Sequence, residues 1–144
     1  MTQLDPSALW MLRALFGMGA LSLVMTIWMG VVRTQTLRLP GLRLEDAAHT
    51  EDIHPRLPPR VRRVVDNYNH LFEAPTLFYA IALAIIVAGI ANPLFAGCSW
   101  AFLTFRVLHS LVQATINVVA LRFAFFALSW VALAIMIVGP MTVL

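Results

Sequence analysis

The stretch APTLFYAIALAIIVAGIANPLFAGCSWAFLTF, residues 74–105, decides the fold of this protein. Its 32 residues include no Asp, Glu, Lys or Arg. About 20 apolar residues are enough to cross the hydrocarbon core of a bilayer, so this stretch is too long for a single membrane span. The pair Asn92-Pro93 lies near its centre. Because proline has no N–H group and disfavours helical backbone at the residue before it, we expect a tight hairpin over residues 91–97 that joins two helices.

Two further uncharged stretches lie on either side of this hairpin. Residues 14–32 and residues 123–144 carry no charge, and each is long enough for one crossing. We therefore expect an all-α integral membrane protein, a four-helix bundle formed as a single domain. The expected spans cover about residues 8–32, 70–91, 95–119 and 121–142, and a long loop covers about residues 33–63.

The composition excludes other classes of protein. Of the 144 residues, 60% are hydrophobic and 12% are charged, against about 45–50% and 25% in an average soluble domain. A soluble protein of this size has too much surface to hide so many apolar side chains. A water-soluble globule, a disordered chain and a fibrous protein are therefore excluded, and the lone Cys98 excludes an intrachain disulfide.

The distribution of arginine predicts the orientation in the membrane. All ten basic residues are Arg, and seven of them lie in the loop over residues 33–63. Arg122 lies in the connection between the last two spans, whereas the opposite side carries Arg13 alone. Because loops rich in Lys and Arg stay in the cytoplasm, we expect both connections to be cytoplasmic and both termini to be extracytoplasmic.

The loop over residues 33–63 is polar and contains four prolines, which break any long helix. His49 and His54 flank Glu51 and Asp52, so a metal site is conceivable there. A solvated loop at the membrane surface, with its Arg side chains near anionic headgroups, is the favoured interpretation. We therefore expect no metal site.

Polar residues concentrate on two helix faces. The run into the second span places Asp66, Asn69, His70 and Glu73 three or four residues apart. The third span carries Arg106, His109, Gln113 and Asn117 at spacings of three, four and four. Residues three or four apart lie on the same face of a helix. Since ionisable groups inside a bilayer are costly, each face is a candidate functional site.

The topology brings both faces to the cytoplasmic side, together with Arg33 and Arg122. We expect one polar pocket there, walled by helices, whose excess of Arg suits an anionic ligand with several carboxylates. Glu73 either pairs with Arg106 or receives an ammonium group of the ligand. In the alternative interpretation, these groups only pair with one another and fix the helix register, as buried ion pairs can do without adding stability.

A stripe of small residues follows the second span. Ala80, Ala84 and Ala88 stand four residues apart. Such stripes let helices approach closely. The stripe therefore favours close packing, either within the chain or between subunits.

The two polar runs resemble those of a known family. NHLFEAPTLFY at residues 69–79, and RVLHS at residues 106–110 followed by Asn117 and Arg122-Phe123, resemble its second-span and third-span motifs. The family is the membrane-associated proteins in eicosanoid and glutathione metabolism (MAPEG), and the motifs resemble its bacterial branch. The resemblance covers nearly the whole chain, including the four spans and the long first cytoplasmic loop.

The resemblance implies a homotrimer in a bacterial inner membrane, with glutathione bound between neighbouring subunits near the cytoplasmic face. It implies a glutathione-dependent transferase or peroxidase that acts on lipophilic electrophiles or lipid hydroperoxides, with membrane lipids and no nucleic acid as partners. Residues at matching polar positions are expected to bind glutathione, namely Arg63, Asn69, His70, Glu73, Arg106, His109 and Gln113. The thiolate is expected to lie beside Arg122 or Arg38, and Arg33 matches the position of Arg38 equally well.

Departures from the family pattern leave a second function open. Gln113 stands where several transferases have a Tyr that contacts the ligand, and an amide has no phenol group to offer. His70 stands where the family often has Asn. An enzyme is the favoured interpretation, and the alternative is a non-catalytic membrane module of the same fold that binds a lipid or a partner protein.

Overall fold

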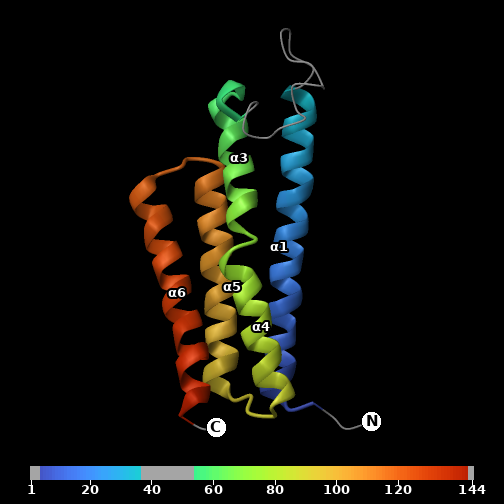
Figure 1. The fold of residues 1–144 in the computed structure, drawn as a ribbon, viewed down its shortest axis with the longest axis vertical. Coiled ribbons are helices and arrows are strands. Elements are labelled where there is room, and N and C mark those ends of the chain that lie inside the picture. Colours follow the sequence, from blue (N-terminus) through green and yellow to red (C-terminus); the bar gives the residue numbers. More distant parts are fainter. Residues whose placement is uncertain (1–3, 37–53, 143–144) are drawn as a thin grey trace.

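A computed structural model describes residues 4–36 and 54–142 of the chain, and every element in these two ranges is helical (Figure 1). The elements are α1 (Pro6–Thr36), the short 3-10 helix η2 (His54–Arg56), α3 (Pro59–His70), α4 (Ala74–Val87), α5 (Pro93–Ala114) and α6 (Val119–Met141). Helices α3 and α4 follow one another along one rod, which stands beside α1, α5 and α6 (Figure 1). The start of α1 and the end of α6 lie at the same end of the bundle.

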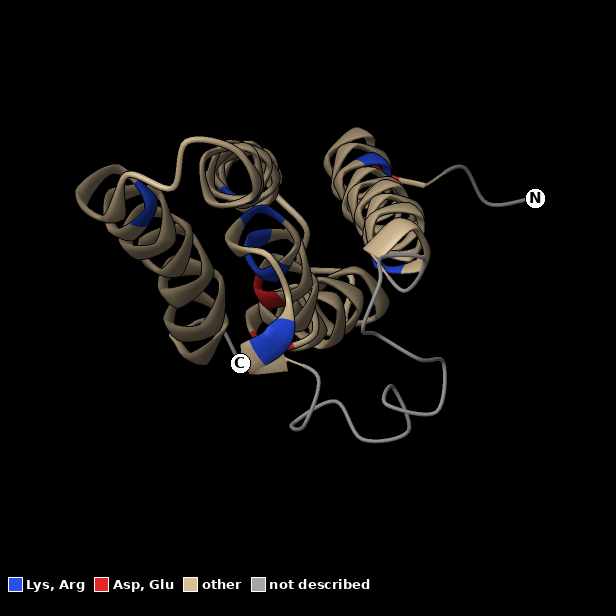
Figure 2. Cartoon of the chain, turned by 90° about the horizontal axis from the view of Figure 1, so that it is seen from above, with Lys and Arg blue, Asp and Glu red and all other residues tan. Residues whose placement is uncertain are grey.

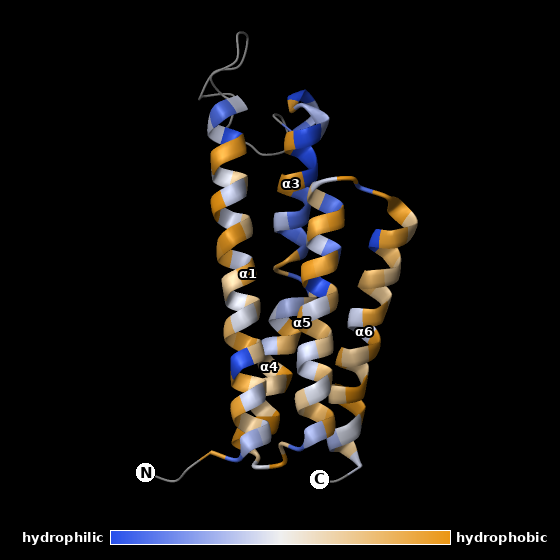
Figure 3. Cartoon of the chain, turned by 180° about the vertical axis from the view of Figure 1, so that it is seen from behind, coloured by the Kyte–Doolittle hydropathy of each residue, from blue (hydrophilic) through white to orange (hydrophobic). Residues whose placement is uncertain are grey.

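All four rods are long and apolar enough to cross a membrane. Figure 3 shows that hydrophilic positions concentrate on α3, whereas the lower halves of the rods are mostly apolar. Large apolar side chains such as Phe16, Val87 and Phe123 are exposed, and the bilayer is the solvent that suits such a surface. The prediction of an all-α integral membrane protein with four spanning helices is confirmed.

The hairpin between the second and third rods is centred on Asn92-Pro93. Pro93 begins α5, where a missing N–H group costs nothing because the first helical N–H groups have no partner within the helix. The Asn92 side chain accepts a hydrogen bond from the Phe95 backbone N–H at 3.0 Å and caps the helix. Gly89 adopts a positive φ of 70° just after α4, a conformation that glycine tolerates. The turn therefore precedes Pro93, a few residues earlier than residues 91–97.

The second rod differs from the expected span over residues 70–91 at its start and in its continuity. Helix α3 begins at Pro59, within the expected loop, because proline is well suited to the first turn of a helix. Its residues Val61 and Val65 pack against α1 beside Met29 and Val32. The rod is then interrupted between α3 and α4, since Pro75 has no N–H group to continue the helical ladder.

The core occupies the centre of the bundle, and α5 is its most enclosed helix. Helix α5 packs against α1, α3 and α6. Phe78 of α4 and Phe102 of α5 stack with ring centroids 4.4 Å apart, and both are fully buried. Met11 and Met18 of α1 reach the same cluster. This packing fixes the rotation of α5, and therefore the direction in which its polar residues point.

Candidate functional site

A buried polar stripe runs along the second half of α5. Arg106, His109, Ser110 and Gln113 follow the spacing of one helix face, and all four side chains are buried. Arg106 is only 1% exposed and His109 only 4%. From α3, Asn67 adds a fully buried amide to the same set. Four charged or polar groups of one helix and a fifth from its neighbour are thus withdrawn from solvent within a single chain.

Many polar atoms of these five side chains have no hydrogen-bond partner among residues 4–36 and 54–142. The unpartnered atoms are Nδ2 and Oδ1 of Asn67, Nε and Nη2 of Arg106, Nε2 of His109, Oγ of Ser110 and Oε1 of Gln113. A buried polar group without a partner costs about 1–3 kcal/mol. Native proteins accept that cost rarely, and usually where a bound molecule completes the hydrogen bonds. The cluster therefore has the character of a site for a polar ligand.

Arg106 is held by aromatic rings and, among the described residues, by no carboxylate. Its guanidinium carbon lies 5.4 Å from the ring centres of both Phe102 and Phe126, within range of cation–π attraction. Glu73 attracts it electrostatically from a longer distance. The Glu73 carboxylate instead contacts His70, so the direct pairing of Glu73 with Arg106 is not formed among the described residues. This leaves both groups available to a ligand.

His109 is fixed by a bond to the backbone of α6. Its Nδ1 lies 3.0 Å from the carbonyl oxygen of Arg122. A carbonyl can only accept, so Nδ1 must carry the hydrogen, and the neutral ring then presents an unpaired lone pair at Nε2. Phe126 and His70 contact the ring with centroids 6.1 and 6.3 Å away. Gln113 lies beside it one turn further along α5.

The edge of the site toward solvent is formed by α3. The His70 Nδ1 lies 3.2 Å from the Glu73 Oε2, and the side chains are 43% and 62% exposed. Asn69 is exposed on the same helix. Basic positions gather on α3 in the view along the bundle axis (Figure 2). The charged and buried parts of the site thus adjoin at His70, which contacts His109.

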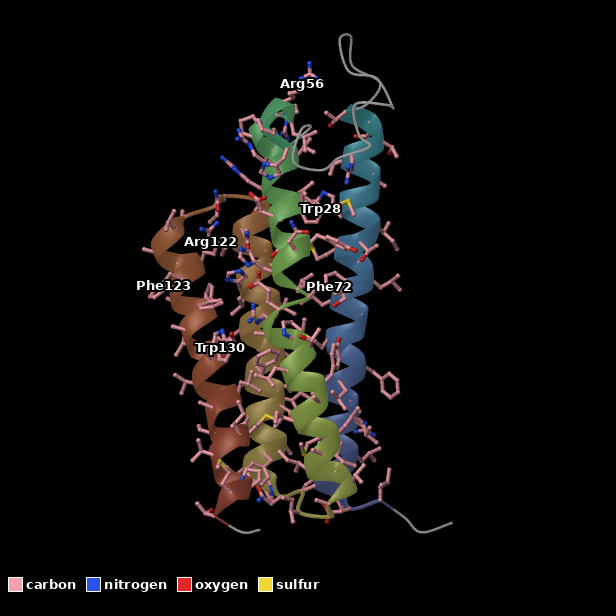
Figure 4. All side chains as sticks on the ribbon, viewed as in Figure 1. Trp28, Arg56, Phe72, Arg122, Phe123 and Trp130 are labelled. Carbon is pink, nitrogen blue, oxygen red and sulfur yellow. The ribbon has the colours of Figure 1, made fainter. Side chains whose placement is uncertain are left out.

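Two further arginines, Arg63 of α3 and Arg122 of α6, bind to the turn between α5 and α6. Arg63 donates from Nη1 to the carbonyl oxygen of Thr115 at 2.8 Å. Arg122 donates from Nη1 to Oδ1 of Asn117 at 2.9 Å. Figure 4 places Arg122 near the start of α6 and its neighbour Phe123 on the outer side of that helix. The backbone of Arg122 is also tied to the site, because its carbonyl oxygen receives the hydrogen bond of His109.

The prediction that Asn117 extends the polar face of the third span is wrong. Helix α5 ends at Ala114, and Asn117 lies in the turn before α6 with a positive φ of 52°. Asparagine tolerates this left-handed conformation better than most residues. Asn117 therefore ends the helix and orients Arg122, and it does not form part of the α5 stripe.

Two cavities adjoin these elements. One of about 650 Å³ lies between α1, α3 and α5, and is lined by Trp28, Val32, Arg60, Arg63, Ala114 and Thr115 among others. The other, of about 360 Å³, is an almost wholly apolar groove between α5 and α6, lined by residues such as Cys98, Phe105 and Leu128. The first combines cations with apolar walls, and the second suits a hydrocarbon chain.

The structure brings together most of the predicted site residues. His70, Glu73, Arg106, His109 and Gln113 form the candidate site, with Arg63 and Arg122 at its margin beside the turn between α5 and α6, and Asn69 on the exposed side of α3. Arg38 lies outside the described residues, as do His49, Glu51 and Asp52 of the conceivable metal site. His54 is described, and its Nε2 contacts Oδ1 of Asp66 at 2.7 Å. In the described ranges no group of three or more His, Cys, Asp or Glu is arranged to hold a metal ion.

Asn67 and Ser110 belong to the cluster, although the sequence pattern did not single them out. Asn67 stands four residues after Arg63 and three before His70, so the helical spacing places it on the same face. Ser110 follows His109 directly and is a small polar residue in an apolar span. The spacing was the available signal for Asn67, whereas the burial of Ser110 depends on how α5 is packed.

Comparison with known proteins supports the family suggested by these residues. The family model described as MAPEG family matches residues 11–142. No curated protein and no solved structure gives a significant match to the chain. The matched region contains most of α1, the whole of the other three rods and every residue of the buried polar cluster. The chain therefore belongs to the MAPEG family.

Proposed function

We propose that this protein is a glutathione-dependent transferase or peroxidase that acts on lipophilic electrophiles or lipid hydroperoxides. The observation that carries the proposal is the buried set of unpartnered polar atoms on α3 and α5, led by the guanidinium of Arg106. Glutathione has two carboxylates, an ammonium group, amides and a thiol. A ligand with both signs of charge and several amides matches a site that offers cations, a carboxylate and free amide groups.

The charges suggest how the ligand is divided among the residues. Glu73, which is free of Arg106, receives the ammonium group. Arg106 and Arg63 bind the carboxylates, because Arg matches a carboxylate with paired N–H donors. Other polar contacts come from Asn69, His70, His109 and Gln113. The thiolate lies beside Arg122 or Arg38, because a nearby cation favours the ionised thiol.

Assembly and location form part of the same proposal. The exposed faces of Ala80, Ala84 and Ala88 do not pack within the chain, which supports close packing of α4 against another subunit in a homotrimer. Lipophilic substrates then enter from the bilayer, and glutathione enters from the cytoplasm. The Arg-rich connections support a bacterial inner-membrane protein with both termini outside the cytoplasm.

The orientation has a direct test. An alkaline phosphatase fused after Leu144 is expected to be active, because that enzyme folds only outside the cytoplasm, where its disulfides form. The same reporter inserted after Thr36 should be inactive. An active insertion after Thr36 with an inactive C-terminal fusion would reverse the assigned orientation.

Glutathione binding is tested first by calorimetry on the purified protein in detergent. We expect Glu73→Gln to weaken binding by about tenfold, because the ammonium group loses one charge-assisted hydrogen bond. The matched control is Asp66→Asn, which makes the same change at a carboxylate of α3 that contacts His54 instead. Its affinity should equal that of the wild type.

A ligand lacking the α-amino group makes this test specific. It should bind the wild type as weakly as glutathione binds the Glu73→Gln variant, and the variant should not distinguish the two ligands. If the variant still prefers glutathione over the desamino ligand by the full wild-type factor, Glu73 does not hold the ammonium group.

A non-catalytic module that binds a lipid or a partner protein is the second candidate. Two observations favour it, namely Gln113 in place of a ligand-binding Tyr and the apolar groove of about 360 Å³ between α5 and α6. This function predicts no glutathione binding at millimolar concentration and retention of a lipid through purification. Glutathione binding that depends on Glu73 would exclude it as the main function.

A further inference from the structure

We infer that His109 is a catalytic residue that takes the proton from the thiol of the bound ligand. This inference rests on the proposed function and adds the step that generates the nucleophile. The side chain of Gln113 is an amide and has no phenol group that could assist the ionisation of the thiol, so another group must do so. Among the buried polar groups of the site, His109 is the one that can accept a proton near neutral pH.

The geometry of His109 suits a proton acceptor. Its Nδ1–H is used by the carbonyl oxygen of Arg122, which fixes the tautomer and the direction of the ring. Its Nε2 is buried, makes no hydrogen bond to the described residues by geometry, and belongs to the same cluster as the unpartnered nitrogens of Arg106, while the Gln113 side chain lies near enough to interact with the ring. A histidine that only stabilised the fold would be expected to have both nitrogens satisfied.

The neighbours of His109 suit both products of the proton transfer. The positive charge of Arg106 acts electrostatically on His109 and disfavours a lasting imidazolium, and the same field adds to that of Arg122 or Arg38 in favouring the ionised thiol. On the other side, the His70 ring stands at 87° to the His109 ring, and His70 in turn contacts Glu73. Glu73 is largely exposed, so His70 and Glu73 mark a short route for the proton to water.

The step balances for an electrophile with a leaving group. The S–H bond breaks, the proton moves to Nε2 of His109, and the electron pair stays on sulfur. The thiolate forms a bond to the electrophilic carbon, and the leaving group departs with the electron pair of the broken bond. The proton then leaves His109 for water, so the thiol and the electrophile become a thioether, a proton and the released anion.

The test uses the full-length protein in detergent, glutathione, and 1-chloro-2,4-dinitrobenzene as the electrophile. His109→Asn keeps an amide N–H near the position of Nδ1 for the Arg122 carbonyl and removes Nε2. At about pH 7 we expect kcat to fall roughly 100-fold, because a positioned acid–base group contributes about that much. The Kd for glutathione should rise by no more than about tenfold, because one neutral contact is lost.

The pH profile separates proton transfer from a structural effect. A free thiol ionises by itself around pH 8.5. The difference in kcat between the wild type and His109→Asn should therefore become steadily smaller above that pH. The ultraviolet absorbance of the thiolate should appear when the wild type binds glutathione at neutral pH and should be absent in the variant. His109→Gln, which supplies an amide near the place of Nε2, should behave like His109→Asn, and retained glutathione binding by both variants shows that loss of folding is not the cause.

A matched control and two contrary results complete the experiment. His54→Asn removes a histidine that contacts Asp66 outside the site, and it should leave kcat and the pH profile unchanged. If the wild type turns over glutathione and His109→Asn has the same kcat at neutral pH, the role of His109 is overturned, whereas the proposed function stands. A wild type with neither glutathione binding nor turnover overturns the proposed function, and the role of His109 with it.

Discussion

Replacing Arg106 with methionine is expected to weaken glutathione binding roughly 100-fold without lowering the thermal stability of the protein. The affinity falls because two donors, Nε and Nη2, lose a carboxylate of the ligand, at about 1.5–3 kcal/mol for a charge-assisted hydrogen bond. The stability holds because no carboxylate in the described part of the chain pairs with this buried charge, and an apolar side chain of similar size removes the cost of burying it.

The difference between the two effects distinguishes a ligand-binding role of Arg106 from a structural role. If Arg106 served only the fold, Arg106→Met would lower the melting temperature and leave any ligand affinity unchanged. Arg13→Met is the matched control, because Arg13 is also an arginine over an aromatic ring but lies outside the site. Its guanidinium carbon is 4.8 Å from the ring centre of Trp10, near the start of α1. It should change neither the affinity nor, by more than a small amount, the melting temperature. Calorimetric titration and thermal unfolding in the same detergent measure both quantities.

Replacing Arg122 with alanine is expected to lower kcat by about 100-fold to 1,000-fold. This is the range for the loss of one preorganised donor that stabilises a developing anion. Glutathione affinity should change much less, because the proposed contact is to the thiolate and matters most after the thiol has ionised. Steady-state rates with a lipophilic electrophile, together with binding by calorimetry, separate the two effects.

The oligomeric state and a neighbouring variant control this second prediction. Chemical cross-linking should show the same assembly for Arg122→Ala as for the wild type. Phe123→Leu changes the next residue, which is 67% exposed on the outer side of α6, and should leave kcat unchanged (Figure 4). Unchanged turnover in Arg122→Ala would remove Arg122 from the reaction and leave the thiolate to another cation.

The membrane fold could be predicted because it depends on properties that act over long stretches of chain. Uncharged stretches of sufficient length require membrane spans, and Asn92-Pro93 divides the longest of them in two. The structure has helices at each of these places. The ends of the helices were harder to predict, because they depend on single residues. Pro59 and Pro75 both lie in the first turn of a helix, but Pro75 follows closely after helix α3 and so separates α3 from α4.

The candidate site was predictable only as a set of faces. The spacing of Arg106, His109 and Gln113 places them on one side of α5 without reference to any other helix. The same reasoning failed for Asn117, because the helix ends three residues before it and the backbone turns. Periodicity says which residues share a face as long as the helix continues, and it does not say where the helix ends.

The sequence by itself determined that this protein has four apolar spans, that its cations lie mainly toward one end, and that two faces carry its polar residues. Only the tertiary structure decided which polar atoms lack partners. Nδ1 of His109 meets the Arg122 carbonyl, and Glu73 meets His70 and not Arg106. Whether a hydrogen bond forms depends on differences of a few tenths of an ångström in the distance between groups on different helices. The packing of Phe78, Phe102 and their neighbours sets those distances.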